Sequence, residues 1–373
     1  MRVLVIAGFA ESLLNFRGPL LSAMIARGLE VHVAAPNLFE DFCIRKKLEL
    51  LSLNLHDICL YRASTNPLTD LKLLCSLTLL IRKIQPDFVL SYTIKPVIYG
   101  TIASWLVGVP RRCTLITGLG YAFTGNAGGV RGLVKIVVQS LYKLALFRSH
   151  KVFFQNNDDY DLFRTLGLIT NRTSTVVVNG SGVDLEFFSV APLPLGPPHF
   201  LMIARLLGDK GVREYAQAAQ QLKAKWPDIE FSLVGWLDQN PDSISQSELD
   251  SWIQSSSLNY LGRLQDIRPA MRQCSVYVLP SYREGMPRTV LEAMAMGRAV
   301  ITTHAPGCRE TVVEGENGFL VPIKSIDVLV SAMERFIYEP QLAHRMGRRG
   351  RELAEERFDV NKINDVMLTN MGL

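Results

Sequence analysis

The sequence predicts an α/β protein with two domains, each built on a parallel β-sheet covered by helices. Short runs of β-branched and other apolar residues alternate with longer helical patterns along the chain, which is typical of parallel sheets. The alternation is interrupted at A-P-L-P-L-G-P-P (residues 191–198), where the prolines preclude both a helix and a central strand. The length of 373 residues is about twice that of a typical domain.

The first domain is expected to span residues 1–190 and to contain six strands. These strands are predicted at Val3–Ala7, Val31–Ala35, Phe88–Tyr92, Cys113–Thr117, Val152–Gln155 and Thr175–Val178. Helices are predicted near Arg17–Arg27, Leu68–Ile84, Val97–Val107, Val130–Phe147 and Asp158–Leu166, each bounded by Gly, Pro or Asp. The acidic triplet at 159–161 resembles a metal-binding motif, but its position after a strand favours a helix start.

The second domain is expected at residues 199–355, after a linker at 191–198. Its strands are predicted at Phe200–Ala204, Ile229–Val234, Asn259–Leu261, Val276–Leu279, Val300–Thr302 and Phe319–Val321. From Ser325 the chain is expected to be helical, and residues 356–373 are expected to pack back on the first domain as a C-terminal helix. Open parallel sheets bind ligands at the carboxyl ends of their strands, so the site is expected between the two domains.

Positive charge is concentrated in one part of the chain. Residues 42–151 contain 15 Lys and Arg but only four Asp and Glu, a net charge of +11, which implies an anionic partner. The basic residues flank aliphatic runs rather than aromatic residues or Gly/Arg repeats, so an anionic membrane surface is favoured and no nucleic acid is expected. The alternative, core-packing helices with solvated basic rims, stays open.

Several classes of protein are excluded by composition and motifs. The six cysteines are scattered without a C-x-x-C pair, which argues against zinc, iron–sulfur and disulfide frameworks and for a reducing compartment. The first apolar run is too short for a signal peptide, and no transmembrane helix is expected. The first βα loop, A-G-F-A-E-S, lacks G-x-G-x-x-G, which argues against an NAD oxidoreductase.

The strongest candidate site follows two strands of the second domain. S-Y-R-E-G-M-P-R-T-V-L-E-A-M-A-M-G (residues 281–297) predicts a turn and a helix start, whose amide groups attract anions. Arg205 and Lys210 follow another strand and can converge on a diphosphate. Glu292 lies among core residues and needs donors such as ribose hydroxyls, and Glu284 would lie at the other end of that ligand. Solvated cations and an amphipathic helix with an N-terminal acid remain the alternative.

With Arg205, Lys210 and the E-x7-E spacing of Glu284 and Glu292, the chain resembles the retaining glycosyltransferases of family 4. The resemblance implies the GT-B fold, two Rossmann-like α/β domains with parallel sheets facing across a cleft. It also implies that Arg205 and Lys210 neutralise a diphosphate leaving group without metal or cofactor, that Glu284 contacts the donor sugar, and that Glu292 holds the ribose. Further donor contacts are expected from Gly8, Arg263, Gly285, Met286, Pro287, Arg288 and Thr289.

The segments S-Y-T-I-K-P-V-I-Y-G and T-G-L-G-Y-A-F-T-G resemble the subgroup that extends lipid-linked oligosaccharides in bacterial surface-glycan pathways, including N-acetylgalactosaminyltransferases. This resemblance implies a UDP-sugar donor, a polyprenyl-diphosphate-linked saccharide acceptor, and a cytoplasmic enzyme peripheral to the inner face of the plasma membrane. Many relatives carry a His-containing triplet where this chain has residues 91–93, so contacts through such a His are in doubt. Acceptor contacts are expected from Arg17, Tyr92, Lys95, Thr117 and Tyr121.

Two other functions are compatible with the same sequence features. A nucleotide-sugar epimerase or hydrolase of the same fold would act without an acceptor, and a non-catalytic membrane-associated module would bind the donor without forming product. The basic first half favours the transferase over a soluble epimerase, which has no need of it. The sequence leaves open the donor sugar, the linkage position and the oligomeric state.

Overall fold

The computed structural model describes residues 1–62, 66–118, 130–238, 240–255 and 257–373, with side chains from 135 onward in the helix that begins at 130. The chain forms two compact units, Met1–Ser181 with Asn361–Leu373, and Gly182–Val360. The first unit therefore ends before the expected boundary at 190. The reason is backbone pairing, because the Val183 N–H donates to the Phe358 carbonyl at 2.8 Å and the Val360 N–H donates to the Val183 carbonyl at 3.1 Å.

The proline-rich segment at 191–198 belongs to the second unit. The Ala191 N–H donates to the Met296 carbonyl at 3.3 Å, and the Arg298 guanidinium donates to the Pro192 carbonyl at 3.1 Å. Arg298 is fully buried, so its hydrogen bond holds the backbone at Pro192 against the interior of the unit. The start of the segment is thus packed through Ala191 and Leu193 against the core of the second unit, whereas Leu195 is fully exposed, as expected of a linker.

The first unit contains a seven-stranded parallel sheet in the order β3-β2-β1-β4-β5-β6-β7. The strands are β1 (Arg2–Ile6), β2 (Glu30–Ala35), β3 (Asn54–Asp57), β4 (Phe88–Tyr92), β5 (Arg111–Ile116), β6 (Lys151–Phe154) and β7 (Thr175–Val177). Six of them match the prediction. The prediction omits β3 because its sequence, N-L-H-D, has no apolar run, and an edge strand needs none.

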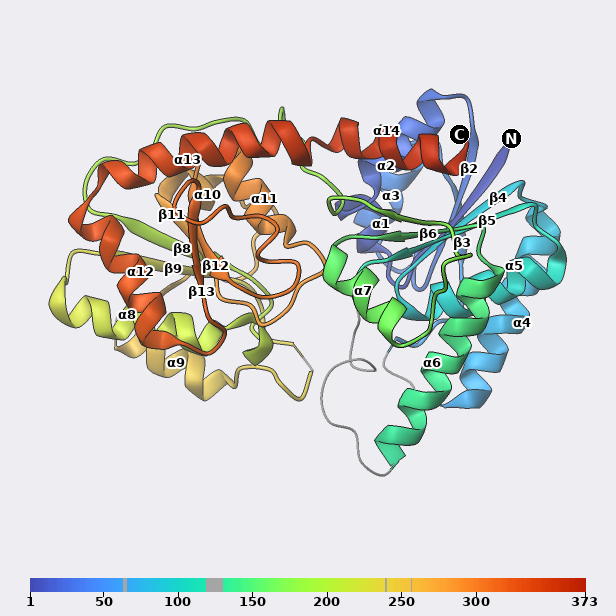
Figure 1. The fold of residues 1–373 in the computed structure, drawn as a ribbon, viewed down its shortest axis with the longest axis horizontal. Helices are drawn as coiled ribbons and strands as arrows, with labels where there is room; N and C mark the ends of the chain where they lie inside the picture. The colour runs from blue at the N-terminus through green and yellow to red at the C-terminus, as the bar shows by residue number, and fades with distance from the viewer. Residues whose placement is uncertain (63–65, 119–129, 239, 256) are drawn as a thin grey trace. The chain divides into compact units, whose positions relative to one another are not determined.

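Helices cover both faces of this sheet (Figure 1). They are α1 (Glu11–Asn15), α2 (Gly18–Ala26), α3 (Phe42–Leu50), α4 (Pro67–Ile84), the π-helix η1 (Pro96–Gly100), α5 (Thr101–Val107), α6 (Val130–Arg148), α7 (Asn157–Thr165) and the C-terminal α14 (Val360–Met371). One core joins the sheet to α1, α2, α3 and α14, and two others join it to α4, α5, α6 and α7. Four side chains of α14 are buried in the first of these cores: Ile363, Met367, Leu368 and Met371.

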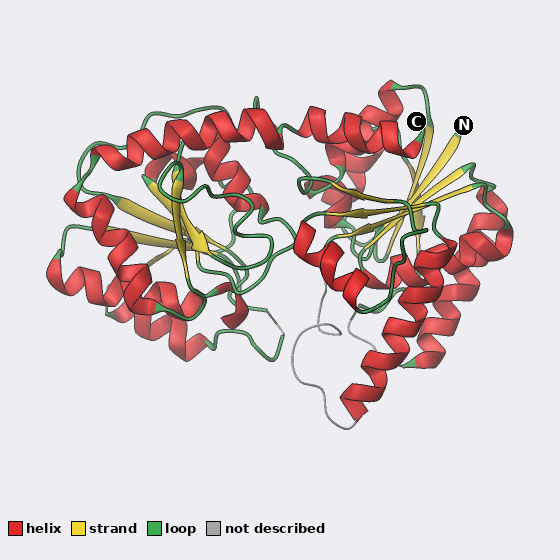
Figure 2. Ribbon diagram, viewed as in Figure 1, coloured by secondary structure: helices red, strands yellow, loops and turns green. Residues whose placement is uncertain are grey.

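The second unit contains a six-stranded parallel sheet in the order β10-β9-β8-β11-β12-β13. Figure 2 shows its strands in yellow among red helices. The strands are β8 (His199–Ile203), β9 (Glu230–Val234), β10 (Asn259–Tyr260), β11 (Val276–Leu279), β12 (Ala299–Thr303) and β13 (Gly318–Val321), at the predicted positions. The helices are η2 (Gly208–Lys210), α8 (Val212–Lys225), α9 (Gln246–Gln254), α10 (Arg268–Gln273), α11 (Arg288–Ala295), α12 (Ile326–Tyr338), α13 (Gln341–Leu353) and η3 (Ala354–Phe358). They surround one continuous apolar core.

The acidic triplet at 159–161 begins a helix, as predicted. The Asn156 side chain caps α7 by accepting a 2.7 Å hydrogen bond from the Asp159 N–H, and Asp159 itself is fully buried. Within the described ranges, no three His, Cys, Asp or Glu side chains are grouped so that they could hold a metal ion. Nor is any helix of that part of the chain long and apolar enough to span a bilayer.

Candidate active site

Neighbouring strands of the second unit bring two distant charged residues together. β8 and β11 pair in parallel, so their carboxyl ends lie at the same edge of the sheet. Lys210 follows β8 in η2, and Glu284 follows β11 in the loop before α11. The Lys210 ammonium lies 2.6 Å from Glu284 Oε1, and the two side chains are only 15% and 18% exposed. The structure therefore brings two of the predicted donor-site residues, Lys210 and Glu284, into direct contact.

The environment keeps the Lys210 ammonium charged. Burial acts to lower the pKa of Lys210, but the charge of Glu284 and its hydrogen bond outweigh burial, so the pKa is raised. The Ser281 hydroxyl donates to the same Glu284 Oε1 at 2.8 Å and helps to fix the carboxylate. A poorly hydrated ammonium held by a counter-ion is well prepared to bind an incoming phosphate oxygen.

Two arginines follow β8 and β10 at the same edge of the sheet. Arg205 lies two residues beyond β8, is 43% exposed, and contacts Asp238 Oδ2 at 3.1 Å. Arg263 follows β10, and its guanidinium lies 4.7 Å from the centre of the Trp236 ring. Since β10, β9, β8 and β11 are consecutive in the sheet, Arg263, Arg205 and Lys210 all lie at this edge, where Arg205 and Lys210 are paired with Asp238 and Glu284.

The turn that carries Glu284 leads directly into α11. Gly285 and Met286 form the turn, Pro287 is the extended N-cap residue without a side-chain cap, and Arg288 and Thr289 begin the helix. The Tyr277 hydroxyl of β11 donates to Thr289 Oγ1 at 2.6 Å, which fixes the first turn on the sheet. A helix start without a side-chain cap has backbone N–H groups directed beyond its end, and such a start suits an anion.

Gly307 sets the position of the Glu284 backbone. The Glu284 N–H donates to the Pro306 carbonyl at 3.0 Å, so the two loops run against each other. Gly307 has φ +79°, and a Cβ placed there would collide with the Glu284 carbonyl. Only glycine fits this combination of close approach and left-handed backbone.

Glu292 lies one turn along α11 and is 4% exposed. Its Oε1 is 2.7 Å from Arg288 Nε, an ion pair between residues i and i+4. Burial raises the pKa of Glu292 above its ordinary value, although Arg288 acts in the opposite direction. The carboxylate is thus only partly compensated, which agrees with the expectation that it needs further hydrogen-bond donors.

Replacing Glu292 by Gln is expected to raise the melting temperature of the ligand-free protein at pH 7. A raised pKa means that the folded state binds the Glu292 proton more tightly than the unfolded state does. The protonated carboxyl therefore stabilises the folded state at acid pH, and this stabilisation is lost as the pH rises from the ordinary value of 4.5 through the raised pKa. The difference in melting temperature between the variant and the wild type should therefore decrease as the pH falls. UDP binding should weaken about tenfold, the loss of one charge-assisted hydrogen bond. Thermal unfolding against pH, with and without UDP, measures both effects, and a lower melting temperature at pH 7 would contradict the argument.

In the first unit, Gly8 lies two residues beyond β1 and packs against Thr93, whose φ is +68°. A Cβ at Gly8 would collide with Thr93 Oγ1, so the loop after β1 approaches the end of β4 closely. Arg17 and Tyr92 are 2% and 1% exposed. The Tyr92 hydroxyl is 2.8 Å from Ser12 Oγ, and the Arg17 guanidinium lies 5.4 Å from the Tyr92 ring centre. Both side chains therefore lie inside the unit, without an open face for an acceptor.

The remaining expected acceptor contacts lie near the ends of β4 and β5. Lys95 Nζ is 2.6 Å from Asp70 Oδ1, and the Tyr99 hydroxyl donates to Asp70 Oδ2 at 2.8 Å. Lys95 is therefore tied to α4 and half-buried with its partner. Thr117 directly follows β5 and is partly exposed, whereas Tyr121 lies outside the described residues.

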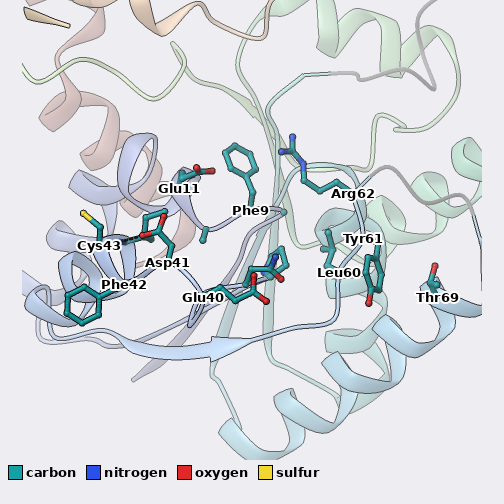
Figure 3. Close-up of a pocket in the computed structure, with 15 residues that line it drawn as sticks. Phe9, Glu11, Glu40, Asp41, Phe42, Cys43, Leu60, Tyr61, Arg62 and Thr69 are labelled. Carbon is teal, nitrogen blue, oxygen red and sulfur yellow. Dashed lines mark hydrogen bonds between the residues drawn. The ribbon is translucent and has the colours of Figure 1, made fainter. Parts of the chain in front are cut away.

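Three features of the structure go beyond the sequence prediction. Ser281 is the first residue of the motif at 281–297, and its contact with Glu284 could have been considered from that position alone. Trp236 follows the glycine at the end of β9, and an exposed Trp at a strand end is itself a signal for a binding edge. The third feature is a cavity in the first unit, lined by Gly8 and by residues without any motif (Figure 3).

Comparison with known families and proteins agrees with this geometry. Residues 184–353 match the family described as "Glycosyl transferases group 1", and residues 4–156 match "Glycosyl transferase 4-like". An N,N'-diacetylbacillosaminyl-diphospho-undecaprenol α-1,3-N-acetylgalactosaminyltransferase of Campylobacter jejuni is 31% identical over 97% of this chain and 96% of its own. A UDP-Gal:α-D-GlcNAc-diphosphoundecaprenol α-1,3-galactosyltransferase of Escherichia coli is 29% identical over 80% of this chain and 79% of its own.

Solved structures agree on the fold. A sucrose-phosphate synthase of Thermosynechococcus elongatus has a TM-score of 0.81 at 18% identity, covering 98% of this chain and 97% of that one. HepE of Anabaena in complex with UDP has a TM-score of 0.78 at 19% identity and covers both chains completely. The two parallel-sheet units are those of the GT-B fold, and this prediction is confirmed.

Proposed function

The chain belongs to the group 1 glycosyltransferases, and from this premise we propose that it transfers a hexose or N-acetylhexosamine from a UDP-sugar to a hydroxyl of a polyprenyl-diphosphate-linked saccharide, with retention of the anomeric configuration. The observation that carries the proposal is the similarity along nearly the whole chain to the Campylobacter transferase, whose name specifies a lipid diphosphate-linked acceptor. The α-1,3 linkages named for two relatives support retention, because UDP-hexoses are α-linked donors.

The residues of the second unit suit the departure of UDP. As the bond from the anomeric carbon to the diphosphate oxygen breaks, negative charge grows on the diphosphate, which takes up the proton that the acceptor hydroxyl loses as its oxygen bonds to that carbon. Lys210, Arg205 and the start of α11 would stabilise this charge, and the proposal requires no metal ion or cofactor. Donor binding would divert Lys210 from Glu284 to the diphosphate and leave Glu284 to accept from sugar hydroxyls.

The proposal is tested with the full chain, four donors and one acceptor. UDP-GalNAc, UDP-GlcNAc, UDP-Gal and UDP-Glc are each incubated with and without a farnesyl-diphosphate-linked N-acetylhexosamine, and UDP release and lipid-linked product are measured. Product with one donor and little UDP release without acceptor support the proposal. Equal UDP release in both conditions would identify a hydrolase, and an absence of product with every donor would count against this acceptor class.

We also propose that the first unit binds the inner face of an anionic membrane. Side chains on α3 and at the start of α4 combine exposed apolar groups with positive charge: Phe42, Leu50, Leu68, Leu71, Arg45, Lys46, Lys47 and Lys72. The buried residues of α4 lie on its other side, so these apolar groups are additional to the core. Exposed apolar side chains among cations suit anionic headgroups.

The double variant Lys46→Gln/Lys47→Gln is expected to bind anionic vesicles about thirtyfold more weakly, because each lysine contributes about 1 kcal/mol near an anionic surface. Flotation with phosphatidylglycerol-containing and with pure phosphatidylcholine vesicles measures the effect. Lys223→Gln/Lys225→Gln changes a partly exposed and an exposed lysine of α8 in the second unit, and this matched control should bind like the wild type. Equal binding to both vesicle types would refute the proposed surface.

A further inference from the structure

The carboxyl end of α11 is held by a side chain from a helix that is distant in sequence. The last four carbonyls of a helix lack partners within it and need donors from elsewhere. In α11, the carbonyls of Ala293 and Met294 accept from backbone N–H groups of the residues that follow, at 2.9 and 3.0 Å. The Ala295 carbonyl accepts from Arg351 Nη1 of α13 at 2.8 Å. Arg351 therefore completes the end of the helix whose start lies at the candidate donor site.

The same guanidinium nitrogen reaches a second segment. Arg351 Nη1 lies 3.3 Å from the Leu185 carbonyl and 3.2 Å from the Phe188 carbonyl. These residues precede the proline-rich segment, whose first residue, Ala191, donates its N–H to the Met296 carbonyl just beyond α11. One cation thus joins the end of α11 to this part of the chain, and its charge suits the negative end of the helix dipole.

A glycine of α13 lets Arg351 come within reach of these carbonyls. A Cβ at Gly347 would collide with the Gly297 carbonyl, so α13 approaches the turn after α11 more closely than a side chain would permit. Arg351 lies one turn further along α13. Its side chain is 19% exposed, and its Nε is 2.6 Å from Glu355 Oε1. This ion pair fixes the direction of the guanidinium, which is partly shielded from water.

A shift at this end of α11 would displace the groups at its start. The helix has eight residues and is about 12 Å long, so its turns move together. Glu292 lies within one turn of the end that Arg351 holds, and the Glu284 loop leads into the first turn. The positions of the buried Glu292 carboxylate and of the N–H groups at the helix start therefore depend on how the other end is fixed.

We propose that Arg351 is a positioning residue for donor binding: by holding the carboxyl end of α11 on Leu185 and Phe188, it sets the place of Glu292 and of the helix start. Arg351 acts through α11 and not by contact with a substrate. The consequence for the nucleotide rests on the proposed function. The fixing of α11 does not, because it depends on contacts within the protein alone.

The first test measures hydrogen exchange of the full chain without ligand, followed by mass spectrometry of peptides that cover α11. Arg351→Met keeps much of the apolar stem but removes the donors, so these peptides should exchange about tenfold faster. Peptides that cover β8 report the global stability of the second unit. Arg349→Met, on the same helix, is the matched control because Arg349 pairs instead with three acidic side chains at the surface, and it should leave α11 unchanged.

The second test measures UDP affinity by calorimetry and donor kinetics. Arg351→Met should bind UDP about tenfold more weakly, which corresponds to about 1.4 kcal/mol. Arg351→Lys, the milder variant, should lose less, because an ammonium can still donate to Ala295 but cannot span both segments. The KM for the donor should rise more than kcat falls, since the proposed ribose contact of Glu292 is the same before and during transfer. A smaller folded fraction would instead lower the apparent kcat and leave KM unchanged.

Unchanged exchange of α11 in Arg351→Met would overturn the proposal, and so would wild-type UDP affinity in that variant. An equal loss of UDP affinity in Arg349→Met would overturn it as well, because the effect would then belong to α13 in general. Faster exchange of α11 in a protein whose wild type binds no UDP would keep Arg351 as the residue that fixes this helix and reject the donor of the proposed function, so the two failures are distinguishable.

Discussion

The variant Lys210→Ala is expected to have a kcat/KM for glycosyl transfer about 10²–10³-fold below that of the wild type, the usual effect of removing one group that stabilises charge in a transition state. Lys210 is the ammonium closest to Glu284 in the described structure, and its raised pKa keeps it positive throughout the neutral range. Without it, the charge on the departing diphosphate would depend on Arg205 and the start of α11. Initial rates against donor concentration measure the effect.

Two controls separate chemistry from folding in this experiment. Lys225→Ala removes an exposed lysine of α8 and should leave the rate unchanged. Lys210→Met keeps most of the side-chain volume and should lose activity like Lys210→Ala, since the charge rather than the stem carries the effect. A Lys210→Ala enzyme with near wild-type kcat/KM and a verified donor would remove this residue from the mechanism.

The second large effect is expected from Gly307→Ala. The new Cβ would collide with the Glu284 carbonyl and would also sit at φ +79°, so the protein should lose at least about 2 kcal/mol of unfolding free energy and the Glu284 loop should shift. The loss of activity should be larger than the loss of unfolding free energy alone accounts for, because Glu284 is displaced from Lys210. Denaturant unfolding and donor kinetics measure the two effects.

Gly315→Ala is the matched control for this variant. Gly315 has φ +78°, almost the same backbone conformation, but a Cβ there would meet no atom within 4 Å. It should lose about 1 kcal/mol from backbone strain alone and keep its kinetics. Equal losses of stability in both variants would show that the contact with Glu284 has no cost of its own.

Much of the candidate site in the second unit could be predicted from the residues that follow its strands. Lys210 and Glu284 could be placed together because each follows a predicted strand, and the carboxyl ends of parallel strands share one edge. Glu292 could be recognised because a carboxylate among core residues is costly and needs a reason. These inferences depend on local pattern and on one general property of parallel sheets.

The first unit shows where such inference stops. The burial of Arg17 and the pairing of Lys95 with Asp70 depend on which helix lies beside which strand, and no local pattern records that. Likewise, β3 is an edge strand with a polar sequence, and the cavity that it borders is built from loops without glycine-rich or charged motifs. Contacts between residues that are distant in sequence determine these features, so they can be identified only in the folded structure.

The C-terminal helix α14 has a consequence for how the protein is made. Its buried residues Ile363, Met367, Leu368 and Met371 complete a core whose strands all lie in the first half of the sequence. Domains commonly fold from the N-terminus while the ribosome is still working. Here the first unit cannot bury that apolar face until residues 363–371 have been translated and have left the exit tunnel. Premature termination after the second unit would therefore damage the unit that was synthesised first.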